Sequence, residues 1–295
     1  MSLRPRRSCL YMPGSNARAL EKSRTLAADT LILDLEDAVA PDAKAMARNQ
    51  VTDAVKAGGF GRREVVIRVN GLTTPWGAED IIAAAQAAPD AILVPKVSTP
   101  GDVMMAAKAM REAGAPETTR LWAMMETPLA MLNADSIART AADPASRLSV
   151  FIMGTNDLAK ETRARLTPGR PSMLAWLSIC VAAARAHRIE IIDGVYNDFS
   201  NEAGLRAECE QGRDFGMDGK TLIHPNQIGP CNEIFAPSGE EVALDKVAQG
   251  ARLVVVLEVP PFSYGEGRLM VSDPLPAGFE IDNPNLMSAG STSEL

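Results

Sequence analysis

Two acidic residues follow apolar runs and are the residues of this sequence best suited to bind a metal ion. Glu126 comes directly after the apolar run 121–125, and Asp157 follows the run 148–153. A carboxylate at the end of a buried strand is unfavourable for folding, whereas carboxylate oxygens are ligands that Mg²⁺ prefers. Each residue alone could be a solvated loop carboxylate or a helix cap. Because they hold equivalent positions after consecutive runs, we expect them to share one Mg²⁺.

Arg68 is a second candidate for chemistry, since it lies within the apolar run 64–69. A buried charge is costly unless it is paired, so one interpretation is an ion pair with Glu36 or Asp37. The other is a guanidinium that binds a substrate carboxylate or stabilises a developing enolate oxygen, with bidentate geometry. The two interpretations are compatible. Together with Asp34, the acidic residues could also bind metal-bound water or position Arg68.

Three further polar positions give weaker signals. Lys96 follows a proline after an apolar run, where it is either a rim lysine or a substrate ligand. Gly14 and Ser15 precede a helical stretch that contains Arg18, an arrangement suited to a phosphate, although Ser15 could be an ordinary helix cap. His224 could be a base, but a structural role with a backbone hydrogen bond is the favoured interpretation.

Short apolar runs alternate with helix-like segments along most of the chain and predict the fold. The runs are residues 8–12, 30–35, 64–69, 91–94, 121–125, 148–153, 189–192 and 220–223. They are continuously apolar, as expected for parallel strands buried on both faces. The pattern predicts an α/β fold, a (β/α)₈ TIM barrel, whose chemistry lies at the carboxyl ends of the strands. A doubly wound sheet is the alternative, but it usually has fewer strands.

Local signals predict where several helices begin and end. We expect Thr99 to cap a helix that stops at Gly114, and Asp42 to cap a helix that stops at residues 58–59. A third helix is expected over residues 171–187.

The chain is expected to divide near residue 237. Residues 1–237 would form the barrel, and residues 238–295 would form a C-terminal helix and an extended arm. Ser238 and Glu241 fit a capping box for a helix over 240–258. The polar end of the arm has a composition typical of disorder.

Composition limits the partners and the compartment. The chain has 295 residues, 46% of them hydrophobic, and a net charge of −7 without a Lys/Arg cluster. These values disfavour nucleic acid or an anionic membrane as a partner. The four cysteines form no CxxC pair, and no apolar run is long enough to span a bilayer. We therefore expect a cytoplasmic protein with reduced thiols.

A series of motifs gives the chain a resemblance to a known family. In order they are Leu10-Tyr11-Met12-Pro13-Gly14, residues 31–39, Arg68-Val69-Asn70-Gly71, residues 94–97, Met125-Glu126-Thr127, residues 154–159, Asp193-Gly194-Val195 and residues 219–225. With these motifs the chain resembles the citrate lyase β-subunit-like CoA-ester lyases of the HpcH/HpaI aldolase superfamily, which include malyl-CoA and citramalyl-CoA lyases.

The resemblance implies a Mg²⁺-dependent TIM-barrel enzyme that forms a homo-oligomer, a trimer or hexamer. Glu126 and Asp157 match the metal ligands of the family. Arg68 matches the arginine that contacts substrate and stabilises the enolate. Arg18 and Lys22 match positions at which members of the family approach the phosphates of CoA.

Four other residues within or beside these motifs are further candidates for the site. Lys96 and Thr127 are candidates for substrate binding. Glu36 and Asp37 are candidates for catalysis.

The C-terminal segment departs from the family pattern. That pattern is Gly-x-Met-Ile/Val-Asp/Glu, and its acid enters the active site of a neighbouring subunit. In residues 267–273 the acid position holds Ser272, and Asp273 comes one residue later. A slip of one residue turns an extended side chain to the opposite face. Asp273 is the candidate for the catalytic acid.

The reaction implied by the resemblance is the cleavage of a β-hydroxyacyl thioester, such as malyl-CoA or citramalyl-CoA, into a 2-oxo acid and acyl-CoA. Three alternatives stay open. They are a malyl-CoA-type thioesterase, a citrate lyase β-subunit that acts on an acyl-carrier thioester, and a barrel that binds CoA or a metabolite without catalysis.

Overall fold

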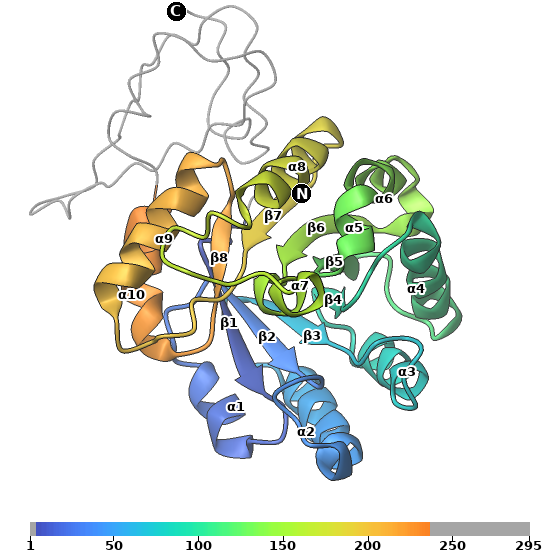
Figure 1. The fold of residues 1–295 in the computed structure, drawn as a ribbon. Coiled ribbons are helices and arrows are strands. Elements are labelled where there is room, and N and C mark those ends of the chain that lie inside the picture. Colours follow the sequence, from blue (N-terminus) through green and yellow to red (C-terminus); the bar gives the residue numbers. More distant parts are fainter. Residues whose placement is uncertain (1–3, 237–295) are drawn as a thin grey trace, which may run out of the picture. The chain divides into compact units, whose positions relative to one another are not determined.

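The computed structural model describes residues 4–236, which form a closed barrel of parallel strands within a ring of helices (Figure 1). The strands are β1 (Ser8–Pro13), β2 (Thr30–Asp34), β3 (Glu64–Arg68), β4 (Ala91–Val94), β5 (Arg120–Met125), β6 (Leu148–Met153), β7 (Glu190–Asp193) and β8 (Gly219–Leu222). Because β1 pairs with β8 as well as with β2, the sheet closes on itself. The predicted (β/α)₈ barrel is confirmed, and every predicted run lies within one residue of a strand.

Helices follow the strands and cover the outside of the barrel. They are α1 (Ala17–Ser23), α2 (Lys44–Ala57), α3 (Gly77–Ala87), α4 (Pro100–Glu112), α5 (Pro128–Leu132), α6 (Ala134–Arg139), α7 (Thr155–Thr162), α8 (Leu174–Ala186), α9 (Glu202–Asp214) and α10 (Ile228–Ile234). Short 3₁₀ turns include η1 (Pro41–Ala43) and η4 (Pro225–Gln227). Within residues 4–236, no helix combines the length and the apolar character needed to cross a membrane.

The predicted helix starts are partly right. Thr99 caps α4, with Asp102 completing a capping box. The predicted cap at Asp42 is wrong, because Asp42 lies inside the 3₁₀ turn η1 that leads into α2, and α2 has no side-chain cap. The helix expected from residue 171 begins at Leu174, as α8.

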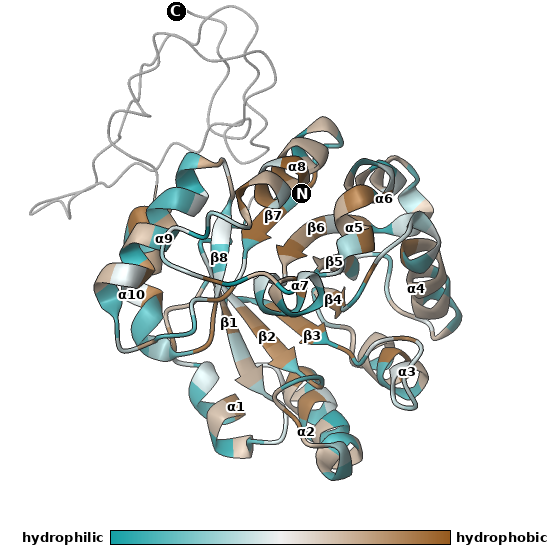
Figure 2. Ribbon diagram, in the orientation of Figure 1, coloured by the Kyte–Doolittle hydropathy of each residue, from teal (hydrophilic) through white to brown (hydrophobic). Residues whose placement is uncertain are grey.

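Alternation along each strand builds two apolar layers. One set of strand residues forms an apolar cluster inside the barrel, which includes Ile32, Val66, Trp122 and Ile152. The residues between them pack outward against the helices. Figure 2 shows the hydrophobic strands enclosed by helices that carry hydrophilic residues. The barrel interior is therefore packed, and the carboxyl ends of the strands are left to form a site.

The predicted boundary at residue 237 stays a prediction. The helix and arm expected over residues 238–295 lie outside the described residues, as does Asp273.

Candidate active site

A cavity of about 300 Å³ lies at the carboxyl ends of the strands. It is lined by Tyr11, Asp34, Asp37, Ala38, Arg68, Met124, Glu126, Met153, Gly154, Thr155, Asn156, Asp157, Val195, Asn197, Thr221 and Ile223. Arg68, Glu126 and Asp157 are thus brought together from β3, the end of β5 and the first turn of α7, as the sequence predicts. In a barrel of this kind, the carboxyl ends of the strands form the usual place for an active site.

Glu126 and Asp157 are joined through Lys96. The Glu126 side chain is buried, and its Oε1 accepts a hydrogen bond of 2.8 Å from the backbone N–H of Lys96. The ammonium group of Lys96 donates to Asp157 Oδ2. Lys96 has a φ of 56°, a left-handed conformation that residues other than glycine seldom adopt. One cationic residue therefore contacts both predicted metal ligands.

Gly154 makes room for Glu126. A Cβ atom at this position would lie 2.5 Å from both Cβ and Oε2 of Glu126. A glycine directly after β6 is therefore required for the Glu126 carboxylate to sit beside the start of α7.

Arg68 is held mainly by Asp34, one of the acidic residues that the sequence predicts could position it. Its Nε and Nη2 donate to Asp34 Oδ1 and Oδ2, each at 2.6 Å. The expected partners are also present, since Nη1 lies 3.0 Å from Glu36 Oε2 and 3.3 Å from Asp37 Oδ2. The guanidinium carbon lies 4.7 Å from the centre of the Tyr11 ring, a cation–π contact. Arg68 therefore belongs to a buried ion pair and also lines the cavity.

Electrostatics at the cavity favour a divalent cation. Five acidic side chains, Asp34, Glu36, Asp37, Glu126 and Asp157, lie in or beside the cavity, against the three cations Arg68, Lys96 and Lys44. Burial raises the pKa of Glu126 to about 7, and nearby Asp157 adds to the rise against the opposing effect of Lys96. A bound dication would favour the charged form of this carboxylate.

The donor set fits Mg²⁺. Glu126 and Asp157 offer two carboxylates as oxygen ligands. Within residues 4–236, no group of three or more His, Cys, Asp or Glu side chains is arranged to hold a metal ion, so a site here would have only these two protein ligands. Mg²⁺ commonly takes one or two protein carboxylates and fills its remaining positions with water and substrate oxygens.

Glu36 is a partly buried acid that, after Asp34, is the next acid close to Arg68. Its Oε2 is within ion-pair distance of Arg68 but makes no hydrogen bond. Burial raises the pKa of Glu36 to about 8, and the negative charges of Glu126, Asp37 and Asp34 reinforce this while Arg68 opposes it. A carboxyl group with such a pKa can exchange protons near neutral pH.

Other predicted site residues have local roles in the described part of the chain. The Thr127 hydroxyl accepts from Ala130 N at 3.0 Å and so caps α5. Arg18 and Lys22 are exposed on α1 and do not line the cavity. Their predicted contacts with substrate and CoA stay predictions.

The remaining polar signals have structural explanations. A Cβ on Gly14 would lie 2.5 Å from the Asp34 carbonyl oxygen, so glycine permits close packing of β1 on β2. Asn16, not Ser15, caps α1. His224 accepts from Asn226 N at 3.2 Å, which agrees with the structural interpretation.

Sequence reasoning missed a pair of asparagines at the cavity. Asn156 Nδ2 donates to Asn197 Oδ1 at 3.0 Å, and Asn197 Nδ2 donates to Asn156 Oδ1 at 2.9 Å. Asn156 is next to Asp157 in sequence, but nothing in the sequence connects it with a residue 41 positions away.

Comparison with known proteins identifies the family of the chain and agrees with this fold. The chain belongs to the HpcH/HpaI aldolase/citrate lyase family, whose model matches residues 7–225. It is 52% identical to a (3S)-malyl-CoA thioesterase of Cereibacter sphaeroides over 81% of this chain and 80% of that protein. It is 34% identical to an L-malyl-CoA/β-methylmalyl-CoA lyase of the same species, over 90% of this chain and 87% of that protein.

A solved structure is also similar. Protein CitE of Mycobacterium tuberculosis in complex with magnesium, acetoacetate and coenzyme A matches with a TM-score of 0.67 at 28% identity. The match covers 82% of this chain and 84% of that one.

Proposed function

We propose that this protein uses Mg²⁺ to hydrolyse a β-hydroxyacyl CoA thioester of the malyl type to the free acid and CoA. The observation that carries the proposal is the meeting of Glu126, Asp157 and Arg68 around one cavity at the mouth of the barrel. The preference for hydrolysis is supported by the relative named (3S)-malyl-CoA thioesterase at 52% identity. Magnesium and a CoA substrate are supported by the similar structure that holds both magnesium and coenzyme A.

Glu126 and Asp157 would hold the metal. When bound, Mg²⁺ supplies a Lewis acid that can orient the hydroxyl and carboxylate oxygens of the acyl group. Lys96, which contacts both carboxylates, would keep them in place.

Arg68 would stabilise negative charge on the substrate. Asp34 fixes one edge of the guanidinium through two hydrogen bonds, so Arg68 is oriented before substrate arrives. A preorganised donor of this kind stabilises the oxyanion that forms as the thioester carbonyl is attacked.

Glu36 is the proposed base. It would take a proton from the attacking water as the water oxygen bonds to the thioester carbon. The carbon–sulfur bond then breaks, and the leaving CoA sulfur takes the proton that Glu36 removed from the water. The products are a carboxylic acid and a free thiol, which accounts for all atoms of thioester and water.

Carbon–carbon cleavage is the second candidate, favoured by the relative named as a lyase at 34% identity. Here a base removes the proton of the substrate hydroxyl. The bond between the carbon that carries this hydroxyl and the carbon next to the thioester carbonyl then breaks. The products are a 2-oxo acid and a thioester enolate, whose charge Arg68 would stabilise until an acid protonates the carbon. Asp273 stays the predicted acid. A trimeric or hexameric assembly and a cytoplasmic location likewise stay predictions.

Product analysis distinguishes these activities. Purified protein with Mg²⁺ is incubated with malyl-CoA or citramalyl-CoA, and products are identified by mass. Malate or citramalate with free CoA supports hydrolysis. Glyoxylate or pyruvate with acetyl-CoA supports the lyase. If neither these substrates nor citryl-CoA is converted, the proposed function is wrong, and a barrel that only binds CoA or a metabolite is favoured.

A further inference from the structure

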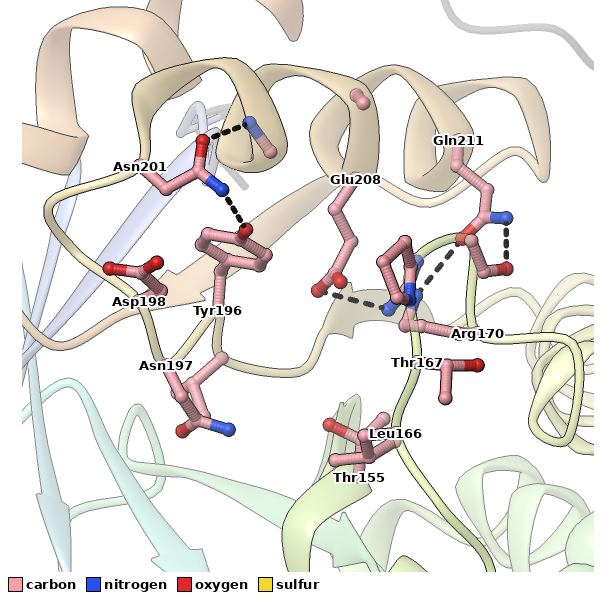
Figure 3. A pocket seen from close by; sticks show the side chains of 15 residues that line it. Thr155, Leu166, Thr167, Arg170, Tyr196, Asn197, Asp198, Asn201, Glu208 and Gln211 are labelled. Atoms are coloured by element: carbon pink, nitrogen blue, oxygen red, sulfur yellow. Dashed lines mark hydrogen bonds and ion pairs between the residues drawn. The ribbon is translucent and has the colours of Figure 1, made fainter.

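A second cavity, of about 340 Å³, lies next to the catalytic cavity. Thr155, Val195 and Asn197 line both cavities. Figure 3 shows Tyr196, Asn197 and Asn201 on one side of the second cavity and Arg170, Glu208 and Gln211 on the other. The two cavities therefore adjoin, and Asn197 is one of the three residues at their boundary.

The amides of Asn156 and Asn197 are paired at this boundary. Their two reciprocal hydrogen bonds, of 3.0 and 2.9 Å, join the first turn of α7 to the loop between β7 and α9. Both residues line the catalytic cavity, and both are exposed. Breaking this bridge requires no change in the barrel core, because exposed amides can form hydrogen bonds with water instead.

The second cavity can accept part of a larger acyl group. Leu166, Pro168 and Val195 give it apolar walls. Arg170 is buried, with Nη1 bound to Asp193 at 2.8 and 3.0 Å and Nε bound to Gln211 at 2.9 Å. Its Nη2 has no partner among the described residues.

We infer that the second cavity is an unused extension of the acyl pocket, and that the Asn156–Asn197 bridge restricts the enzyme to short acyl groups. The inference rests on the proposed function, since it concerns the acyl part of the same thioester substrate. It assigns Asn156 and Asn197 as residues that determine specificity.

Substitution of either asparagine should widen acyl specificity. The measurement is the ratio of kcat/KM for β-methylmalyl-CoA to that for malyl-CoA, in the wild type and in Asn197→Ala. One additional carbon in a closed pocket changes selectivity by about 10- to 200-fold, so the ratio should rise at least about tenfold. Asn156→Ala should give the same rise, and the double variant should add little because the two amides act as one unit. Asn226→Ala removes an exposed asparagine that lines neither cavity and should leave the ratio unchanged.

Two results would overturn the inference. One is an unchanged ratio in both single variants. The other is an equal loss of activity on both substrates with a higher Mg²⁺ requirement, which would mean that the bridge only positions Asp157. A second measurement needs no turnover. Wild type and variants are titrated calorimetrically with malate and with 3-methylmalate in the presence of Mg²⁺, and the ratio of the two dissociation constants is compared between them. If wild-type protein converts neither thioester, the proposed function fails, while the shift in that binding ratio still decides whether the bridge limits the pocket.

Discussion

Asp34 at the end of β2 binds Arg68 at the end of β3 through two parallel hydrogen bonds, although both side chains are buried. Burial raises the pKa of Asp34, but the charge and hydrogen bonds of Arg68 outweigh burial and hold that pKa below its ordinary value. Asp34 also accepts from the backbone N–H groups of Glu36 and Ala38, so it shapes the acidic loop as well. This one carboxylate thus orients the guanidinium and binds the backbone of Glu36, the proposed base.

Asp34→Asn should strongly lower stability. Removing one charge from a buried pair typically costs about 3–5 kcal/mol, and we expect the lower end of this range because Glu36 and Asp37 still face Arg68. Denaturant unfolding measures the loss. Asp135→Asn is a matched control, because Asp135 is an exposed residue whose contacts with Arg139 and His187 are open to solvent, so its loss should change stability far less. Equal losses in the two variants would contradict the importance given to the Asp34–Arg68 pair.

Gly154→Ala should impair metal binding more than folding. The added Cβ would lie 2.5 Å from Cβ and Oε2 of Glu126, so the carboxylate must move. We expect the half-saturating Mg²⁺ concentration to rise at least about tenfold, with a loss of stability of about 1–3 kcal/mol. Gly229→Ala on α10 is the control, since a Cβ there meets no atom within 4 Å. Unaltered Mg²⁺ dependence in Gly154→Ala would show that Glu126 does not need its present position.

The buried charges at the end of β7 should make stability depend on pH. Burial raises the pKa of Asp193, but Lys220 and Arg170 outweigh burial and lower it overall. The carboxylate therefore stabilises the fold fully above its unfolded-state pKa of about 4, and the contribution is lost as the pH falls from there through the lower folded-state pKa. The difference in unfolding free energy between wild type and Asp193→Asn should shrink by up to about 1.4 kcal/mol per pH unit below pH 4. A constant difference between pH 5 and pH 3 would contradict the lowered pKa.

The barrel is largely predictable from sequence because its strands are buried on both faces. Each strand is then a short apolar run, and its polar end marks the mouth of the barrel. Glu126, Asp157 and Arg68 stand out for the same reason, since a charge at the end of or within such a run needs a partner.

Contacts between residues far apart in the sequence could not be predicted in the same way. The Asn156–Asn197 bridge joins the first turn of α7 to the loop before α9, and the paired hydrogen bonds of Asp34 with Arg68 depend on the register of β2 against β3. The cap predicted at Asp42 is wrong for a local reason. A 3₁₀ turn over Pro41–Ala43 precedes α2, so Asp42 lies within this turn and does not precede the first helical residue.

The Mg²⁺ dependence of malyl-CoA conversion tests the central claim most directly. Rates are measured against Mg²⁺ concentration for wild type, Glu126→Gln and Asp157→Asn, after removal of metal with a chelator. We predict no wild-type activity without Mg²⁺, and a loss of kcat/KM on the order of 10²-fold in each variant, as expected when a ligand of the metal is removed. Full activity in Glu126→Gln, or in wild type without metal, would contradict the assignment of Glu126 and Asp157 as the residues that hold Mg²⁺.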